Sequence, residues 1–240
     1  MFVLTGTLAA VDWLTGALPV FCLILLIVSG FVVFILRNRR HNAEFKALAA
    51  RLGLKYHSEA SGVMRLHPRL DLFGFGTICR VRNHMRGTVG EIMVRLFDYQ
   101  YTYSSGNHGE REPWRTISAV LIELPGKHRK VRADPCDPRC VRNPADEKWR
   151  VDVFDDDFDA RYEVTARNVE FARTVFNSDS IGHVKKYADM HVEVADSAAL
   201  FHRDRKLPTD EIADLLKTAI EFLKCVPEFE FAKHGEPSMR

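Results

Sequence analysis

The densest group of potential metal ligands is an acidic cluster at Asp155, Asp156, Asp157 and Asp159. Several carboxylates in one loop can coordinate a hard cation through their oxygens. The cluster lacks the Asp-x-Asp-x-Asp-Gly spacing and the bidentate Glu of a calcium loop, and it falls in a predicted hairpin turn, where acidic residues are common. We therefore assign no metal site and keep Asp155, Asp157 and Asp159 as candidates.

A second potential metal-binding group is the pair Cys136 and Cys140, whose spacing is within the range used by zinc sites. A closed site needs two more ligands, and His128 is the nearest candidate. The cysteines also lack the regular spacing of a disulfide framework. Reduced thiols in a Pro-rich loop are the simpler interpretation, and we predict no cofactor.

Basic residues gather in a predicted loop over residues 127–142, and Lys127, Arg129, Lys130 and Arg132 could contact a lipid headgroup or a protein partner. The loop has no aromatic residues for base stacking. Outside residues 1–36 the net charge is only about +3, which does not indicate a nucleic-acid binder. A solvated loop is the simpler interpretation, and headgroup or partner contact is the functional alternative.

Recognisable catalytic motifs are absent from the sequence. The ten histidines form no His-Glu-x-x-His or His-x-His pattern, and there is no Gly-x-Ser-x-Gly motif. The Gly-rich stretch at 73–76 is not followed by the Lys-Ser or Lys-Thr pair of a phosphate-binding loop. An enzyme remains the alternative, most simply a hydrolase with a site near the acidic loop or at Asp98 and His84.

The elements that would position these residues begin with an uncharged apolar stretch from Leu14 to Leu36. Its length suits a transmembrane helix. Trp13 marks one interface, and Arg37, Arg39 and Arg40 mark the cytoplasmic flank. A cleaved signal peptide would need a basic start and a shorter apolar core. The pattern predicts a single-pass signal anchor in a bacterial inner membrane, with the N-terminus outside.

The rest of the chain alternates strand and helix patterns. Apolar residues at helical spacing predict a helix over 43–52, ended by Gly53, and another over 209–225. In the strand over 88–103, Ile92, Val94 and Leu96 share one face, whereas Phe97, Tyr99, Tyr101 and Tyr103 share the other. The remaining predicted elements are strands over 115–124, 149–153, 162–165 and 190–202 and a short helix capped by Asn168.

This order of elements predicts an α+β fold, with one N-terminal transmembrane helix followed by a mainly antiparallel β domain with flanking helices. A pleckstrin-homology-like arrangement is one way to build it. The predicted organisation is an extracytoplasmic N-terminus at 1–13, the transmembrane helix at 14–36, a basic juxtamembrane segment at 37–42 and a cytosolic domain at 43–240.

Two segments carry a family resemblance: Leu72–Gly76, LFGFG, and Met85–Tyr103, MRGTVGEIMVRLFDYQYTY. Together with the early Phe-x-x-Leu-Ala helix, they resemble a family of uncharacterised bacterial membrane-anchored proteins whose cytosolic domain carries a Phe-Asp-Tyr-x-Tyr strand. The resemblance covers about half of the domain. It implies the domain organisation and location, and no activity, substrate or catalytic residue.

Together these features predict a membrane-tethered binding or scaffold module rather than an enzyme. Its expected contacts are a protein partner or the membrane surface, and no nucleic acid. A tether raises the effective concentration of a weak binder at the membrane. The alternative function is a membrane-anchored hydrolase.

Overall fold

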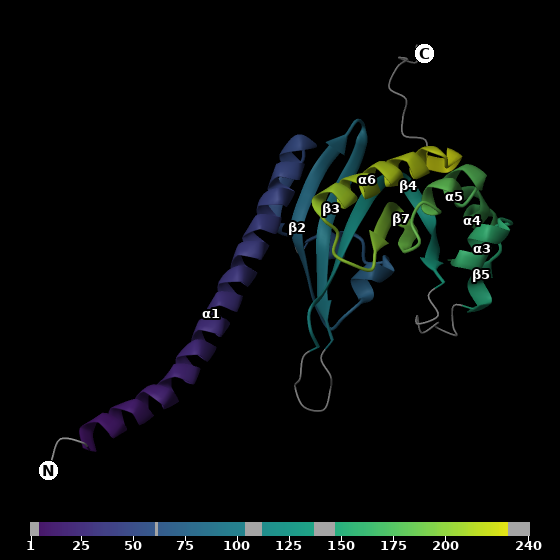
Figure 1. The fold of residues 1–240 in the computed structure, drawn as a ribbon. Helices are drawn as coiled ribbons and strands as arrows, with labels where there is room; N and C mark the ends of the chain where they lie inside the picture. The colour runs from purple at the N-terminus through teal and green to yellow at the C-terminus, as the bar shows by residue number, and fades with distance from the viewer. Residues whose placement is uncertain (1–4, 61, 104–111, 137–146, 230–240) are drawn as a thin grey trace. The chain divides into compact units, whose positions relative to one another are not determined.

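The computed structural model describes residues 5–60, 62–103, 112–136 and 147–229, as the coloured parts of Figure 1 show. The chain divides into two compact units, residues 1–44 and 45–240. The strands of the described chain all lie in the second unit.

Helix α1 runs from Thr5 to Arg51 and includes the predicted transmembrane segment. Among the residues that the structure describes, no helix is long and apolar enough to cross a membrane. The predicted transmembrane helix at 14–36 is therefore wrong, and so are the single-pass signal-anchor topology and the inner-membrane location derived from it.

The last two turns of α1 belong to the core of the second unit. Phe45, Leu48 and Ala49 are buried and pack in its larger hydrophobic cluster. The helix ends at Arg51, and Gly53 takes φ +70°, a left-handed conformation that glycine adopts without steric cost. This confirms the predicted helix end.

The second unit is a mixed α/β domain built on one antiparallel sheet of seven strands. Its order is β1-β2-β3-β4-β6-β5, and β7 also pairs with β4. The strands are β1 (Lys55–Glu59), β2 (Ile78–Val89), β3 (Ile92–Thr102), β4 (Arg115–Pro135), β5 (Arg150–Val151), β6 (Tyr162–Ala166) and β7 (Met190–Arg203). This branched sheet, in which β4 pairs with three other strands, replaces the pleckstrin-homology-like arrangement considered above.

Strand β3 buries both of its faces, in two different hydrophobic clusters. Val94 and Leu96 belong to the larger cluster, whereas Phe97 and Tyr99 belong to a smaller one on the opposite face. This confirms the change of apolar face predicted for the strand. Because side chains alternate along a strand, β3 separates the two cores.

Strand β4 is longer than predicted, because the basic stretch expected as a loop continues it to Pro135. Val131 and Ala133 are fully buried between charged neighbours, which is the alternation of a strand. Gly126 takes φ +80°, and the pairing register of β4 with β7 shifts between Glu123 and Val131. These irregularities bend the strand rather than end it.

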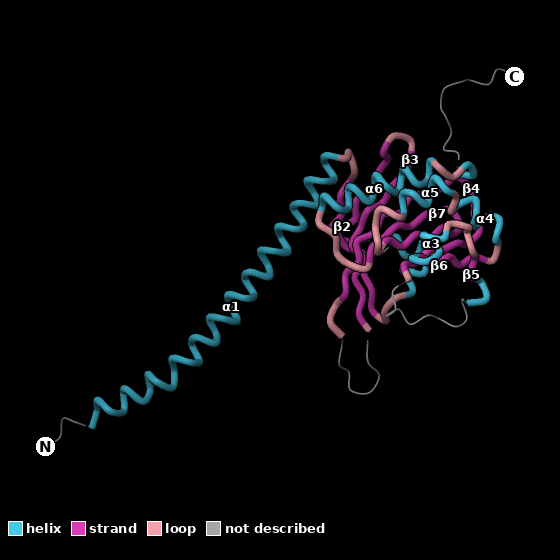
Figure 2. The backbone as a smooth tube through the Cα atoms, turned by 45° about the vertical axis from the view of Figure 1, so that its right-hand side comes forward, coloured by secondary structure: helices cyan, strands magenta, loops and turns pink. Residues whose placement is uncertain are grey.

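Helices cover the larger cluster. They are α3 (Asp156–Arg161), α4 (Val169–Val175), α5 (Ser178–Val184) and α6 (Thr209–Lys224). Figures 1 and 2 show α6 lying across β4 and β7, with α3, α4 and α5 gathered beside β5 and β6. Asn168 caps α4 by accepting a hydrogen bond from the Phe171 backbone N–H at 2.7 Å, as predicted.

The opposite face of the sheet is covered by the segment between β1 and β2. It contains α2 (Gly62–Leu66) and the 3-10 helix η1 (Asp71–Gly74), which contribute Val63 and Leu72 to the smaller cluster. There are two more single-turn 3-10 helices. Helix η2 (Glu147–Trp149) precedes β5, and η3 (Pro227–Phe229) follows α6. Asp71, in η1, lies against strands β4 and β7.

Candidate functional site

The candidate site forms because β7 folds back on itself. His191 and His202 lie near its two ends, and a straight strand would place residues 11 positions apart about 36 Å from each other. Their ring centroids are only 4.4 Å apart, and the rings are stacked at an interplanar angle of 7°. Asp196, midway along the strand, has φ +51°, the conformation of a bend rather than of a regular strand.

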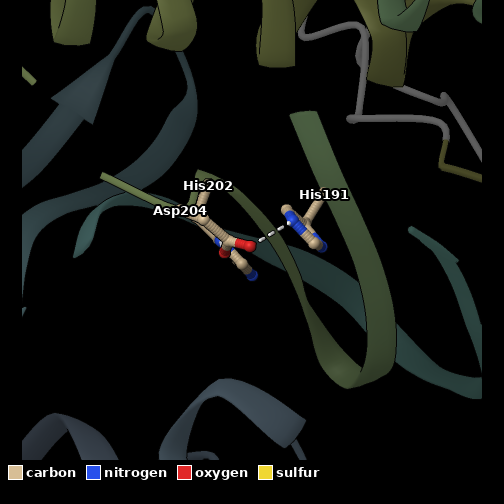
Figure 3. A group of neighbouring side chains, drawn as sticks. All are labelled: His191, His202 and Asp204. Carbon is tan, nitrogen blue, oxygen red and sulfur yellow. Dashed lines mark ion pairs between the residues drawn. The ribbon is translucent and has the colours of Figure 1, made fainter. Parts of the chain in front are cut away.

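Asp204, one residue past the end of β7, completes the cluster with the two histidines. His191 Nε2 lies 3.1 Å from Asp204 Oδ2, and His202 Nδ1 lies 3.6 Å from Asp204 Oδ1. One ligand atom from each of the three residues lies within 4.8 Å of the others. Figure 3 shows the three side chains facing one another, with the His191–Asp204 ion pair dashed.

A second carboxylate fixes the other side of the His191 ring. Its Nδ1 atom lies 2.8 Å from Asp134 Oδ1 on β4. Arg132 pairs with Asp134, and its other guanidinium nitrogen donates to Asp71 Oδ2 at 2.7 Å. This chain of charged groups holds the ring with Nε2 directed at Asp204.

The pKa values of the two histidines are shifted in opposite directions. Burial lowers the pKa of His202 to about 3, and the nearby charge of His191 acts in the same direction. Burial alone would also lower the pKa of His191, but its hydrogen bonds with Asp134 and Asp204 outweigh burial and raise that pKa to about 9. Without a bound ion, the cluster therefore holds one charged and one neutral imidazole at neutral pH.

His202 has an unsatisfied polar atom. Its side chain is 7% exposed, and Nδ1 has no hydrogen-bond partner among the described residues. Buried polar atoms in native proteins are nearly always satisfied, and leaving one unpaired costs about 1–3 kcal/mol. This nitrogen is directed at the carboxylate of Asp204 and is the group in the cluster with spare coordinating capacity.

A pocket of about 510 Å³ adjoins the cluster, and Asp204 is part of its lining. Its aromatic wall consists of Phe75, Tyr101 and Tyr103, and its basic residues are Arg115, Arg205 and Lys206. Phe75 and Tyr103 are each 40% exposed, whereas Tyr101 is 8% exposed. Aromatic walls with a few convergent polar groups are typical of small-molecule sites.

The pocket wall is held in place by neighbouring contacts. Tyr99 donates a hydrogen bond from its hydroxyl to the Phe75 carbonyl at 2.8 Å. Tyr101 packs against Phe75 and Tyr103, with centroid distances of 6.1 and 5.8 Å. Arg205 is held by Glu211, whose Oε2 lies 2.5 Å from Nη2. The wall is therefore formed before any ligand arrives.

Two of the acidic residues singled out in the sequence, Asp155 and Asp157, converge on the ammonium group of Lys185, whereas Asp159 has a different partner. Asp155 caps α3 and pairs with Lys185 at 3.0 Å, and Asp157 pairs with Lys185 at 2.7 Å. Asp159 instead accepts a hydrogen bond from the Val153 backbone N–H at 3.4 Å. Their carboxylates stabilise the β5–β6 connection, and a metal role for them stays a prediction.

The basic residues separate into two groups. Lys127 and Arg129 are exposed. Lys130 pairs with Asp71 and, at 3.0 Å, with Glu193, and Arg132 belongs to the chain of charges behind His191. Contact with a headgroup or a partner stays a prediction, and the structure gives Lys130 and Arg132 intramolecular partners.

The residues assigned to membrane topology lie on α1. The side chains of Trp13 and Arg37 lie outside the described residues. Arg39 is exposed, and Arg40 forms a 3.0 Å pair with Glu44 one turn away. The described part of the chain contains no transmembrane helix for these residues to orient.

The pair considered for hydrolysis is not assembled. Asp98 accepts hydrogen bonds from Ser118 Oγ at 2.6 Å and from Asn83 Nδ2 at 2.8 Å. Both ring nitrogens of His84 are buried without a hydrogen-bond partner among the described residues. Ser118 therefore has a carboxylate but no histidine base, and the arrangement is that of a buried structural network.

The zinc alternative lies partly outside the described chain. Cys140 is not among the described residues, and Cys136 is a free thiol. His128 Nε2 contacts the Pro125 carbonyl at 2.8 Å, and its ring packs on Phe229.

Sequence reasoning missed His191, His202 and Asp204. The available signal was the spacing of His202 and Asp204, because residues two apart lie on the same face of a strand.

Comparison with known proteins adds a fold relationship. No family model and no curated protein matches the chain. Among solved structures, the crystal structure of the mycobacterial trehalose monomycolate transport factor A, TtfA, matches with a TM-score of 0.57 and 13% identity, covering 79% of this chain and 97% of that one. At this identity the match shows shared fold alone. The chain is thus similar in fold to a transport factor.

Proposed function

We propose that this chain is a non-catalytic binding module and that its ligand site is the pocket beside Asp204. The observation that carries the proposal is the pocket itself, of about 510 Å³, with an aromatic wall and charged groups at its rim. Its volume suits a small molecule or the polar end of a larger one.

The lining favours a neutral ligand rich in hydroxyl groups. Phe75, Tyr101 and Tyr103 present ring surfaces on which an apolar face of a sugar ring can pack. Arg115 is a hydrogen-bond donor only, whereas the Asp204 carboxylate is an acceptor only. A hydroxyl group both donates and accepts, so it can use both residues, whereas a bare anion could pair only with the basic residues of the lining and would leave the Asp204 carboxylate without a donor.

The name of the structural neighbour supports the same ligand class. That protein is a transport factor for trehalose monomycolate, whose polar part is a sugar. We extend to this chain only the idea that a domain of this fold handles a carbohydrate-bearing molecule. A protein partner for the module stays a prediction, and the membrane tether is no longer part of the proposed function.

Titration of the full chain with trehalose, followed by NMR, tests the proposal. We expect saturable shifts of signals from the pocket, and weakening of at least about tenfold in Tyr103→Ala, because this substitution removes one stacking surface. Phe154→Ala is the matched control, since Phe154 is also an exposed aromatic residue but packs against Arg173 outside the pocket.

The control variant should bind trehalose as the unmodified chain does. Saturable binding of inorganic phosphate in place of trehalose would refute the neutral ligand class. If neither probe binds, or if both variants bind equally well, the pocket is not the ligand site.

A further inference from the structure

We propose that His191, His202 and Asp204 bind a divalent transition-metal ion, such as Zn²⁺, through two imidazole nitrogens and one carboxylate. The three side chains face one another in Figure 3, and their donor atoms lie within 4.8 Å of one another. The inference uses different observations from the proposed carbohydrate pocket and does not rest on it.

The donor atoms need only small movements to reach coordinating positions. Zinc takes imidazole nitrogen at about 2.0–2.1 Å and carboxylate oxygen at about 2.0–2.2 Å, so two ligand atoms on one tetrahedral ion are about 3.4 Å apart. His191 Nε2 and Asp204 Oδ2 are already 3.1 Å apart, and His202 Nδ1 is 3.6 Å from Asp204 Oδ1. No pair of donor atoms is more than 4.8 Å apart, so the longest separation has to shorten by at most about 1.4 Å.

The buried nitrogen of His202 is the independent observation that indicates a ligand. Its side chain is 7% exposed, and Nδ1 has no hydrogen-bond partner within the described chain, although it lies 3.6 Å from Asp204 Oδ1. A metal ion at the centre of the cluster would satisfy this atom. It would also take the place of a proton on His191 Nε2, 3.1 Å from Asp204 Oδ2.

The surroundings of His191 match those of metal-bound histidines. A ligating histidine usually donates its other ring N–H to a carboxylate, which fixes the ring and makes the ligand more basic. His191 Nδ1 has this partner in Asp134 at 2.8 Å, and Asp134 is held in turn by Arg132. The supporting groups are therefore in place on β4, one strand away from the ligands.

The donor set and its location define the kind of ion. Two nitrogen donors disfavour Ca²⁺ and Mg²⁺, which prefer oxygen, whereas two histidines with one carboxylate suit Zn²⁺ and other first-row divalent ions. Three protein ligands leave at least one coordination position. Asp204 is 56% exposed and lines the pocket, so that position is open to water or to a ligand in the pocket.

The test uses the full chain after removal of metals with a chelator. Co²⁺ replaces Zn²⁺ as a spectroscopic probe, and Zn²⁺ affinity is measured by calorimetry. We expect about one Co²⁺ per chain, visible absorption bands of a nitrogen- and oxygen-ligated ion, and no thiolate band that would indicate cysteine ligands. His202→Gln and Asp204→Asn should each weaken Zn²⁺ binding by at least about tenfold.

His183→Gln is the matched control, because His183 also faces a carboxylate, Glu221 at 3.5 Å, but belongs to no group of three potential ligands among the described residues. Its Zn²⁺ affinity should equal that of the unmodified chain. Circular dichroism establishes that each variant is folded, and Asp204→Asn, at an exposed position, covers the case in which His202→Gln does not fold.

Three results would overturn the inference. They are absence of a Co²⁺ spectrum, a thiolate band, or equal Zn²⁺ affinity in all variants. If the unmodified chain binds no metal but His202→Gln and Asp204→Asn lower its thermal stability, the cluster is a set of ion pairs that stabilises the contact between the two ends of β7. Because His202 does not line the pocket, trehalose titration of His202→Gln separates the metal inference from the proposed function.

Discussion

Replacing His84 with leucine should make the protein less sensitive to acid. His84 lies on β2 with 4% of its surface exposed, and both ring nitrogens lack a hydrogen-bond partner in the described chain. Burial, followed by the positive charge of Arg95, lowers its pKa from 6.5 to about 4. The folded state therefore resists protonation of this ring, whereas the unfolded state takes up the proton near pH 6.5.

The sign and size follow from proton linkage. Below about pH 6.5 the unfolded state binds more protons than the folded state, so stability falls as the pH falls, and the loss is complete below the folded pKa of about 4. The full shift corresponds to roughly 3 kcal/mol, of which about 2 kcal/mol is lost by about pH 5. Screening by nearby solvent reduces the expected loss at about pH 5 to between about 1 and 2 kcal/mol.

Urea unfolding of the full chain at about pH 7.5 and about pH 5, followed by tryptophan fluorescence, measures this loss. His84→Leu should lose about 1–2 kcal/mol less than the unmodified chain over this interval, and it should be nearly neutral at the higher pH because no hydrogen bond is removed. His57→Leu is the control, since His57 is exposed and its ring centroid lies 6.0 Å from that of His84. Parallel pH profiles for His84→Leu and the unmodified chain would refute the reasoning.

Two further predictions concern the buried hydrogen bond of Asp98 and two glycines with positive φ angles. Asp98→Ala should cost about 3 kcal/mol in the free energy of unfolding, because Ser118 Oγ loses a buried acceptor at 2.6 Å; a loss below about 1 kcal/mol in urea unfolding would contradict this. Gly76→Ala should lower the stability of the folded protein more than Gly126→Ala does, although the two glycines have nearly equal φ angles of +82° and +80°. A Cβ at Gly76 would lie 2.8 Å from Tyr101 Cβ, whereas one at Gly126 meets nothing within 4 Å. Each should show the left-handed backbone cost of about 1–2 kcal/mol, and equal thermal shifts in the two variants would exclude the clash.

Local signals in the sequence predicted individual elements well. The α1 end at Arg51 followed from Gly53, and the start of α4 followed from the cap at Asn168. The change of face in β3 followed from the break in alternation where two apolar residues, Leu96 and Phe97, are adjacent. Each of these features depends on residues within a few positions of one another, which is the range over which caps and alternation act. The resemblance to an uncharacterised bacterial family has no such test and stays a prediction.

Reasoning from composition alone failed in two places. The apolar stretch at 14–36 was interpreted as a transmembrane helix, but no helix in the described residues meets that requirement. The basic stretch after Gly126 was interpreted as a loop, because its charged residues hide the two buried positions Val131 and Ala133. In β4 those charges are neutralised by partners distant in sequence, such as Asp71 against Arg132. Ion pairs between residues so far apart in the sequence cannot be read from a local sequence pattern.

The candidate metal site depends on a feature that alternation rules exclude. His191 and His202 are an odd number of positions apart, so a straight strand would place them on opposite faces as well as far from each other. The bend at Asp196, matched by the register shifts of β4 beyond Glu123, reverses the strand and brings both rings to one side. The polar pair Asp196 and Ser197, between the apolar residues 194–195 and 198–201, marks where the bend occurs. The site therefore exists only once β4 has paired with both halves of β7, which makes it a property of tertiary structure rather than of any local motif.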